Sequence, residues 1–94
     1  MKITALEIIA DPKPWRTGGD TLIAKFNVEY AGLRITNCLL IRVSRGFLLA
    51  QLPRGTGRDE GKRLIEIIDP EIRKALAESA YQAFTMLGGT EQTA

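Results

Sequence analysis

Apolar and polar residues alternate along much of the first half of the chain, as they do in strands with one face in a core and the other in water. From Thr21 to Tyr30 every second residue is apolar, with Ile23 as the exception. The alternation resumes from Leu33 to Val43, with Leu33, Ile35, Leu39, Ile41 and Val43 on one side. The short Ala31-Gly32 connection between the two runs predicts a β-hairpin.

Further strands are predicted on either side of this hairpin. Residues Lys2 to Ile9 form an apolar run whose residues suit a strand covered in part on both faces. After a tight turn at residues 44–46, Phe47 to Leu52 predicts a fourth strand, and Pro53 ends it because proline lacks the backbone donor. A brief fifth strand is predicted from Arg63 to Ile68.

A helix is predicted directly after this last run. Asp69 suits the N-cap, Pro70 the first helical position, and Glu71 the positive end of the helix dipole. The Gly88-Gly89 pair suits the end of the helix. Between these two ends, apolar residues recur at intervals of three and four, at Ile72, Leu76, Ala80, Ala83, Phe84 and Leu87.

These elements together predict an α+β fold, in which a four- to five-stranded antiparallel meander is covered on one face by a single carboxy-terminal helix. We expect a single domain over residues 1–89 and a disordered tail over residues 90–94. A chain of 94 residues buries only a modest core by itself, which favours a homodimer formed by strand pairing.

Composition narrows the possible chemistry. The chain has no histidine and a single cysteine, Cys38, so we expect no metal site, no cofactor and no internal disulfide. Cys38 suits a small buried residue in the middle of a strand. The amino terminus lacks the pattern of a signal peptide, and no apolar run is long enough to span a bilayer, so we expect a cytoplasmic protein without membrane contact.

Charge is distributed unevenly although the net charge is only +2. The stretch from Arg42 to Arg63 contains six basic and two acidic residues, so its net charge is +4. Part of it is a glycine-rich loop, where glycine lets the backbone approach a ligand and arginine matches the geometry of phosphate oxygens. The phosphate-binding candidates in this loop are Arg54, Arg58, Lys62 and Arg63.

A second interpretation of the same loop is a solvated connection, in which Asp59 and Glu60 pair locally with Arg58 and Lys62. Two interpretations also apply to Trp15, in the loop from Asp11 to Asp20. It is either a stacking platform for an unpaired base or a lid packed on the core.

Known catalytic motifs do not fit the loop. Gly55-x-Gly57 followed by Glu60 lacks the dinucleotide fingerprint, and Gly61-Lys62-Arg63 lacks the residues of a phosphate-binding P-loop. Asp59 and Glu60 are adjacent on a loop that offers no burial for acid–base catalysis. We therefore expect no catalytic residues, no enzyme activity and no small-molecule substrate.

The best-matched motif is Gly-Phe-x-x-x-x-x-Pro, formed by Gly46, Phe47 and Pro53. With the hydrophilic loop, Asp69-Pro70 and a helix containing Ala80-Tyr81, it makes residues 2–87 resemble the SpoVG family of bacterial septation regulators, as a divergent member. The resemblance implies a dimeric α+β protein that binds DNA and RNA and regulates transcription without catalysis. It adds the nearby helix to the interface, so the candidate nucleic-acid-binding residues are Arg45, Arg54, Arg58, Lys62, Arg63, Arg73 and Lys74.

Two alternatives remain open. The first is a protein-interaction subunit that pairs through an uncovered sheet edge, with Leu40, Leu48 and Leu52 in the contact. The second is similar to the single-stranded-DNA-binding coactivators and predicts a basic sheet face instead of a basic loop. That face would contain Lys25, Arg34 and Arg42.

Overall fold

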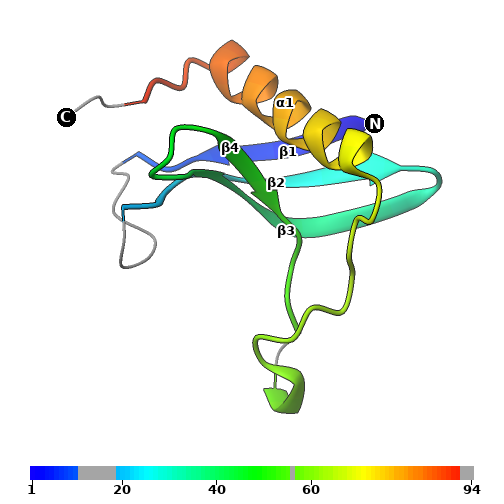
Figure 1. Ribbon diagram of the computed structural model, residues 1–94. Helices are drawn as coiled ribbons and strands as arrows, with labels where there is room; N and C mark the ends of the chain where they lie inside the picture. The colour runs from blue at the N-terminus through cyan, green and yellow to red at the C-terminus, as the bar shows by residue number, and fades with distance from the viewer. Residues whose placement is uncertain (11–18, 56, 92–94) are drawn as a thin grey trace.

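The computed structural model describes residues 1–10, 19–55 and 57–91. It contains a four-stranded sheet in the order β1-β2-β3-β4, with every neighbouring pair antiparallel, and one long helix lying across one face (Figure 1). The α+β meander predicted from the sequence is confirmed. The elements are β1 Lys2–Ile8, β2 Thr21–Tyr30, β3 Leu33–Arg42, β4 Leu48–Gln51, the 3₁₀ turn η1 Gly57–Asp59 and α1 Pro70–Met86.

The hairpin between β2 and β3 is the longest pairing in the sheet. Its two connecting residues, Ala31 and Gly32, both have positive φ, at 52° and 79°. Two consecutive positive φ values suit the primed turns that match the twist of paired strands. The predicted hairpin is therefore present, with a two-residue turn.

A β-bulge in β3 changes which residues face the core. Val28 pairs with Ile35 and Phe26 with Cys38, so Thr36 and Asn37 together face Asn27. Asn37 has a φ of 61°, and its backbone N–H donates to Asn27 Oδ1 at 3.1 Å. The extra residue reverses the alternation. Cys38 and Leu40 consequently join the core, and the simple alternation predicted through Leu39 is wrong.

The core lies between the sheet and α1. It contains residues of β2, β3, β4 and α1, and Cys38, Leu40 and Ala80 have no exposed surface. The predicted helix stripe is correct for Leu76, Ala80 and Phe84. The main cluster is Ile23, Ala24, Phe26, Val28, Cys38, Leu40, Ala50, Leu76, Ala77, Ala80 and Phe84.

Three predictions about burial are corrected. Leu87 is 61% exposed, because the helix ends at Met86 and Leu87 is its C-cap. Ala77, which the predicted stripe omits, is buried against the sheet. Leu40 cannot take part in an interface with another chain, because it pairs between Ala24 and Ala50 inside the sheet.

Both ends of α1 have the predicted caps. The Asp69 carboxylate accepts a hydrogen bond from the backbone N–H of Glu71 at 2.9 Å, and Pro70 takes the first helical position. At the other end the N–H groups of Gly88 and Gly89 donate to the carbonyls of Thr85 and Phe84. Gly88 has a φ of 89°. This is a Schellman motif, which satisfies carbonyls of the last turn.

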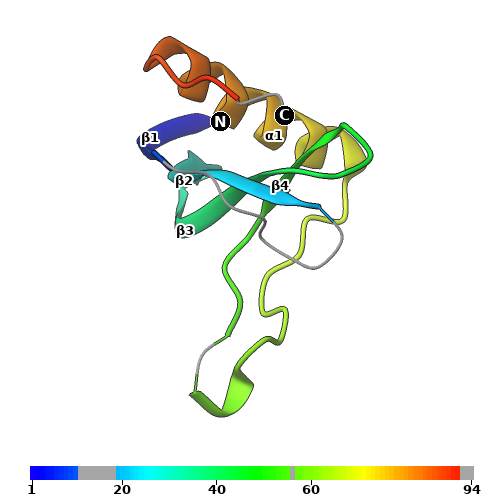
Figure 2. The same ribbon diagram turned by 90° about the vertical axis from the view of Figure 1, so that its left-hand side faces the viewer.

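A long arm, whose described residues are 52–55 and 57–69, connects β4 to α1. In both ribbon views it projects away from the sheet and the helix and then returns (Figures 1 and 2). We call residues 52–55 its descending leg and residues 62–68 its return leg. The predicted strand from Arg63 to Ile68 is wrong, because this segment is extended but belongs to no sheet.

Some predictions fall at the limits of the described chain. Trp15 lies outside the described residues. The predicted tail is described only as far as Glu91, whose carboxylate contacts Arg42 and Tyr81. The one long helix in the described ranges lacks the length and apolar character needed to cross a membrane.

Candidate nucleic-acid interface

Backbone hydrogen bonds hold the tip of the arm closed. The N–H of Gly55 donates to the carbonyl of Lys62 at 2.9 Å, and the N–H of Gly61 donates to the carbonyl of Gly55 at 3.2 Å. Within the tip, Lys62 N–H donates to the carbonyl of Asp59 at 3.0 Å. The two legs are thus joined at the tip by peptide groups.

Gly55 lies close to both the tip and the return leg. A methyl group added there would lie 2.5 Å from the carbonyl oxygen of Asp59 and 3.1 Å from a methyl carbon of Leu64. Both distances are shorter than a side chain normally tolerates. Glycine is required at this position by space.

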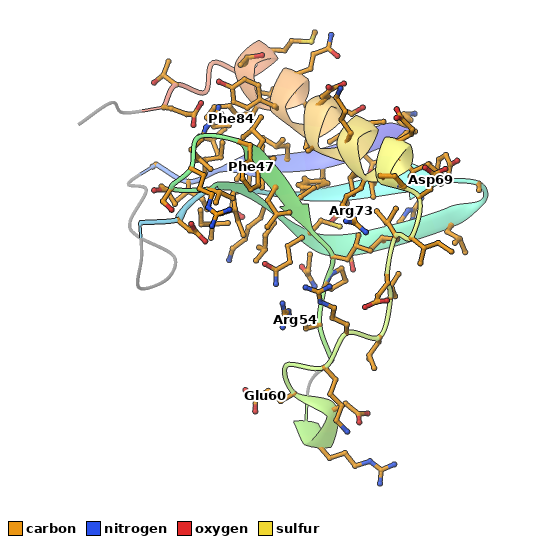
Figure 3. All side chains as sticks on the ribbon, viewed as in Figure 1. Phe47, Arg54, Glu60, Asp69, Arg73 and Phe84 are labelled. Carbon is orange, nitrogen blue, oxygen red and sulfur yellow. The ribbon has the colours of Figure 1, made fainter. Side chains whose placement is uncertain are left out.

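A cleft opens between the two legs and the start of α1. It is lined by β4 from Leu49, the descending leg as far as Arg54, Arg63, the segment from Ile65 to Ile68, and Arg73. Figure 3 shows Arg54 on the arm below the sheet and Arg73 at the beginning of the helix. The cleft therefore brings together Arg54, Arg63 and Arg73, three of the seven predicted residues, from separate parts of the chain.

The charge around the cleft is positive. Its lining holds these three arginines, and Glu66 is the single acidic residue among the described residues that line it. Arg63 Nη1 lies 3.8 Å from Glu66 Oε1, with both side chains more than half exposed. A pair at that distance and exposure is weak, so it neutralises the site little.

Two of the guanidinium groups are held in place by the arm itself. Arg54 Nη1 donates to the carbonyl of Gly61 at 3.1 Å, and Arg73 Nη2 donates to the carbonyl of Ile67 at 2.5 Å. A guanidinium has five N–H groups, and each of these bonds uses a single nitrogen. Both arginines are therefore positioned while retaining donors for an anion.

The other predicted residues lie outside the cleft. Arg58 is exposed in η1, and Lys62 Nζ lies 3.5 Å from Asp59, so the local pairing predicted for this lysine is present. Arg45 is exposed in the turn at the opposite end of β4. Lys74 is on the exposed side of α1, with its Nζ 4.0 Å from Glu78.

The return leg also exposes large apolar side chains, which the sequence analysis assigned to a strand of the sheet. Leu64 is 63% exposed, Ile65 45% and Ile68 88%. In the sequence these residues resemble any half-buried strand. Only the position of the arm, away from the sheet, shows that the described sheet leaves them largely exposed.

The alternative basic face on the sheet is not assembled. The Arg34 guanidinium bonds the Glu29 carboxylate, with Nη2 at 2.6 Å. Arg42 instead lies on the side of α1, where its Nε bonds Glu91 at 2.6 Å. Lys25 pairs with Leu39 on the opposite side from the core. Two of the three charges are thus paired, and the three residues do not share a face.

Glu91 is the centre of a polar cluster that holds the end of the chain against the body. Its carboxylate accepts from Arg42 and from the Tyr81 hydroxyl, the latter at 2.7 Å, and the Arg42 guanidinium lies 5.5 Å from the Tyr81 ring centre. The hydrogen bond from Arg42 lowers the pKa of Glu91, and the bond from Tyr81 lowers it further. Burial acts in the opposite direction but is outweighed. The same bond from its hydroxyl to Glu91 raises the pKa of Tyr81.

The described residues contain no group of three or more cysteine or acidic side chains placed to hold a metal ion. Burial raises the pKa of the Cys38 thiol to about 11, so this side chain is neutral near pH 7. Its Sγ lies 3.9 Å from the carbonyl of Ile35, inside the core. Cys38 is therefore a core residue, as predicted.

Comparison with protein-family models, curated proteins and solved structures finds no match to this chain. The resemblance to the SpoVG family stays a prediction. The function is therefore argued below from the arm and its cleft.

Proposed function

We propose that this chain is a non-catalytic regulator that binds DNA or RNA through its arm, mainly by contacts to the phosphate backbone. The single observation that supports this function best is the cleft in which Arg54, Arg63 and Arg73 meet. These residues are separated in sequence, so their convergence depends on the fold of the arm. Arginine groups held around one space suit the oxygens of a phosphate.

The rest of the arm suits the same role. Arg58 is exposed at the tip, beyond the cleft, where it can add a further phosphate contact. The arm projects into solvent, where a long polyanion can reach its charges from more than one side (Figure 2). Phosphate contacts of this kind give affinity that depends on salt and little on sequence.

The proposal includes a homodimer in which two return legs pair. Exposed apolar residues on an extended segment that belongs to no sheet suit pairing with another strand. The contact would use Leu64 and Ile68, which are 63% and 88% exposed, and would leave Arg63 and Ile65 to the cleft. Two clefts in one particle would then contact one nucleic acid.

The test of binding is fluorescence anisotropy with labelled single-stranded DNA, duplex DNA and RNA at two salt concentrations. The variant that removes the cleft charges is Arg54→Gln/Arg63→Gln/Arg73→Gln. Each lost phosphate contact reduces the dependence of log K on log salt by about 0.7 to 0.9. We expect the triple variant to lose most of the affinity at low salt and to show a slope smaller by about 2.

The matched control is Arg45→Gln/Lys74→Gln/Arg34→Gln, which removes the same charge outside the cleft. It should bind far better than the cleft variant, with circular dichroism showing that both retain the fold. Equal losses in the two variants would mean that net charge, and not the cleft, governs binding. Failure of the wild type to bind any of the three probes at low salt would remove the nucleic-acid function.

A protein-interaction subunit is the second candidate, and the exposed return leg favours it specifically. In that case Leu64→Glu/Ile68→Glu changes the sedimentation of the particle, and no nucleic acid binds to the wild type. Analytical ultracentrifugation over a range of concentrations measures this self-association. A wild type that sediments as a monomer at all concentrations contradicts the homodimer.

A further inference from the structure

We propose that the cleft of the arm receives one unpaired nucleotide, so that the chain binds single strands of DNA or RNA more tightly than duplexes. This inference rests on the proposed nucleic-acid function, and it names the form of nucleic acid that the cleft selects. Two observations support it: the cleft wall contains both apolar and cationic side chains, and two of its arginines are fixed by hydrogen bonds to backbone carbonyls.

The wall of the cleft combines cations with apolar surface. Leu52 and Pro53 line it from the descending leg, and Ile65 and Ile67 line it from the return leg, alongside the three arginines. Ile65 is 45% exposed, so its side chain is accessible to a ligand. A phosphate by itself suits only the arginines and leaves this apolar surface without a partner.

An unpaired nucleotide satisfies both parts of the wall. Its phosphate suits a guanidinium, and the flat face of its base suits proline, isoleucine and the plane of an arginine side chain. Arg54 and Arg73 are already fixed by bonds to the carbonyls of Gly61 and Ile67, so little side-chain freedom is lost when a base lies against them.

A duplex offers this cleft much less. Its base faces are stacked on one another, and its grooves present only base edges and the backbone. A duplex also favours a broad positive surface, whereas the arginines of the sheet are paired, Arg34 with Glu29 and Arg42 with Glu91. The positive charge that remains on the arm surrounds a cleft between two thin legs.

The experiment compares three labelled probes of equal length on the wild type: oligothymidine, a single strand of abasic residues, and a duplex. The abasic strand carries the same phosphates as oligothymidine but has no bases. Stacking on aromatic side chains contributes about 1 to 3 kcal/mol per base, and this wall has no aromatic residue among its described lining. We therefore expect oligothymidine to bind roughly fivefold to tenfold more tightly than either other probe.

A pair of variants locates the effect. Ile65→Ser should lower the affinity for oligothymidine and bring the ratio of the oligothymidine affinity to the abasic affinity toward one. Leu33→Ser is the matched control, because Leu33 is also exposed, at 64%, but lies at the β2–β3 turn. It should keep the wild-type ratio.

The outcomes separate this inference from the function on which it rests. Equal affinity for oligothymidine and the abasic strand, or duplex binding as tight as single-strand binding, overturns the unpaired-nucleotide cleft. Salt-dependent binding of all three probes that the triple glutamine variant abolishes would still support the proposed function. Absence of binding to every probe removes both. The wild-type comparison decides the point even if Ile65→Ser does not fold.

Discussion

The body of the molecule and its arm are stabilised in different ways. In the body, β2, β3 and α1 bury side chains such as Phe84, Leu40 and Val28 almost completely. In the arm, Gly55 is the one buried residue among those described. The body holds itself together by burial of apolar surface. The arm packs Leu52 and Ile67 against the core at its base, and its tip depends on a few hydrogen bonds.

This difference indicates where function lies. The body exposes apolar side chains chiefly at its turns and helix end, such as Leu33, Phe47 and Leu87, and two of its arginines are paired with carboxylates. The arm exposes both apolar and cationic side chains that the fold does not require there. Exposed groups of this kind on a projecting segment are typical of a surface that binds something.

The largest effect on stability is expected for Phe84→Ala. Phe84 is 2% exposed, and its ring lies 5.7 Å from that of Tyr81. Removal of a buried aromatic side chain costs about 3 to 5 kcal/mol, because it loses contacts and leaves a cavity. Urea unfolding measures this change.

Ile68→Ala on the arm is the control for Phe84→Ala, because Ile68 is 88% exposed. It should change the free energy of unfolding by less than about 0.5 kcal/mol at a concentration where the protein is monomeric. Equal losses in the two variants would contradict the division between body and arm.

An intermediate effect, confined to the arm, is expected for Gly55→Ala. The added methyl would meet the Asp59 carbonyl, so the tip must open or shift. We expect the amide of Gly61 to lose protection from hydrogen exchange and nucleic-acid affinity to fall several-fold. The free energy of unfolding should change by no more than about 1 kcal/mol.

Glu60→Ala is the control for Gly55→Ala, because Glu60 is exposed at the same tip. It removes a negative charge without a steric conflict, so Gly61 should keep its protection and affinity should not fall. Loss of cooperative unfolding in Gly55→Ala would show instead that the arm and the body form one unit.

The smallest effect is expected for Glu91→Gln, and it depends on pH. The pKa of Glu91 is lowered in the folded state, so its ionised form stabilises the fold above the unfolded pKa of about 4.3. This contribution is lost as the pH falls through the lower folded value. We expect Glu91→Gln to cost less than about 1 kcal/mol at pH 7, with no difference in strong acid.

Thermal unfolding at several pH values measures the effect of Glu91→Gln. Glu78→Gln is its control, because Glu78 is an exposed partner of Lys74 at 4.0 Å. A cost for Glu91→Gln that is the same in strong acid as at pH 7 would show that the carboxylate charge is not responsible.

The body was largely predictable because its signals are local. The alternation in β2, the Ala31-Gly32 turn and the Asp69-Pro70 start each identify an element within a few residues. The bulge at Asn37 was not predictable from alternation, because one residue in a left-handed conformation reverses the side-chain direction without changing the composition. The core role of Leu40 follows from that bulge.

The arm was less predictable. Residues 63–68 have the composition of a strand, but strand formation needs a partner, and none within the described chain lies beside them. The sequence offered seven basic residues as one candidate set, and three of them line the cleft. It did not predict which would meet, because Arg73 approaches Arg54 and Arg63 only through the path of the return leg.

The buried thiol has a practical consequence for all of these measurements. Cys38 is the single cysteine of the chain, it has no exposed surface, and its pKa is about 11. Maleimide reagents, which need an accessible thiolate, would leave it unmodified in the folded protein. Glu60→Cys would then give the folded protein one reactive thiol, so a spin label or dye could be attached at the arm tip without first replacing Cys38.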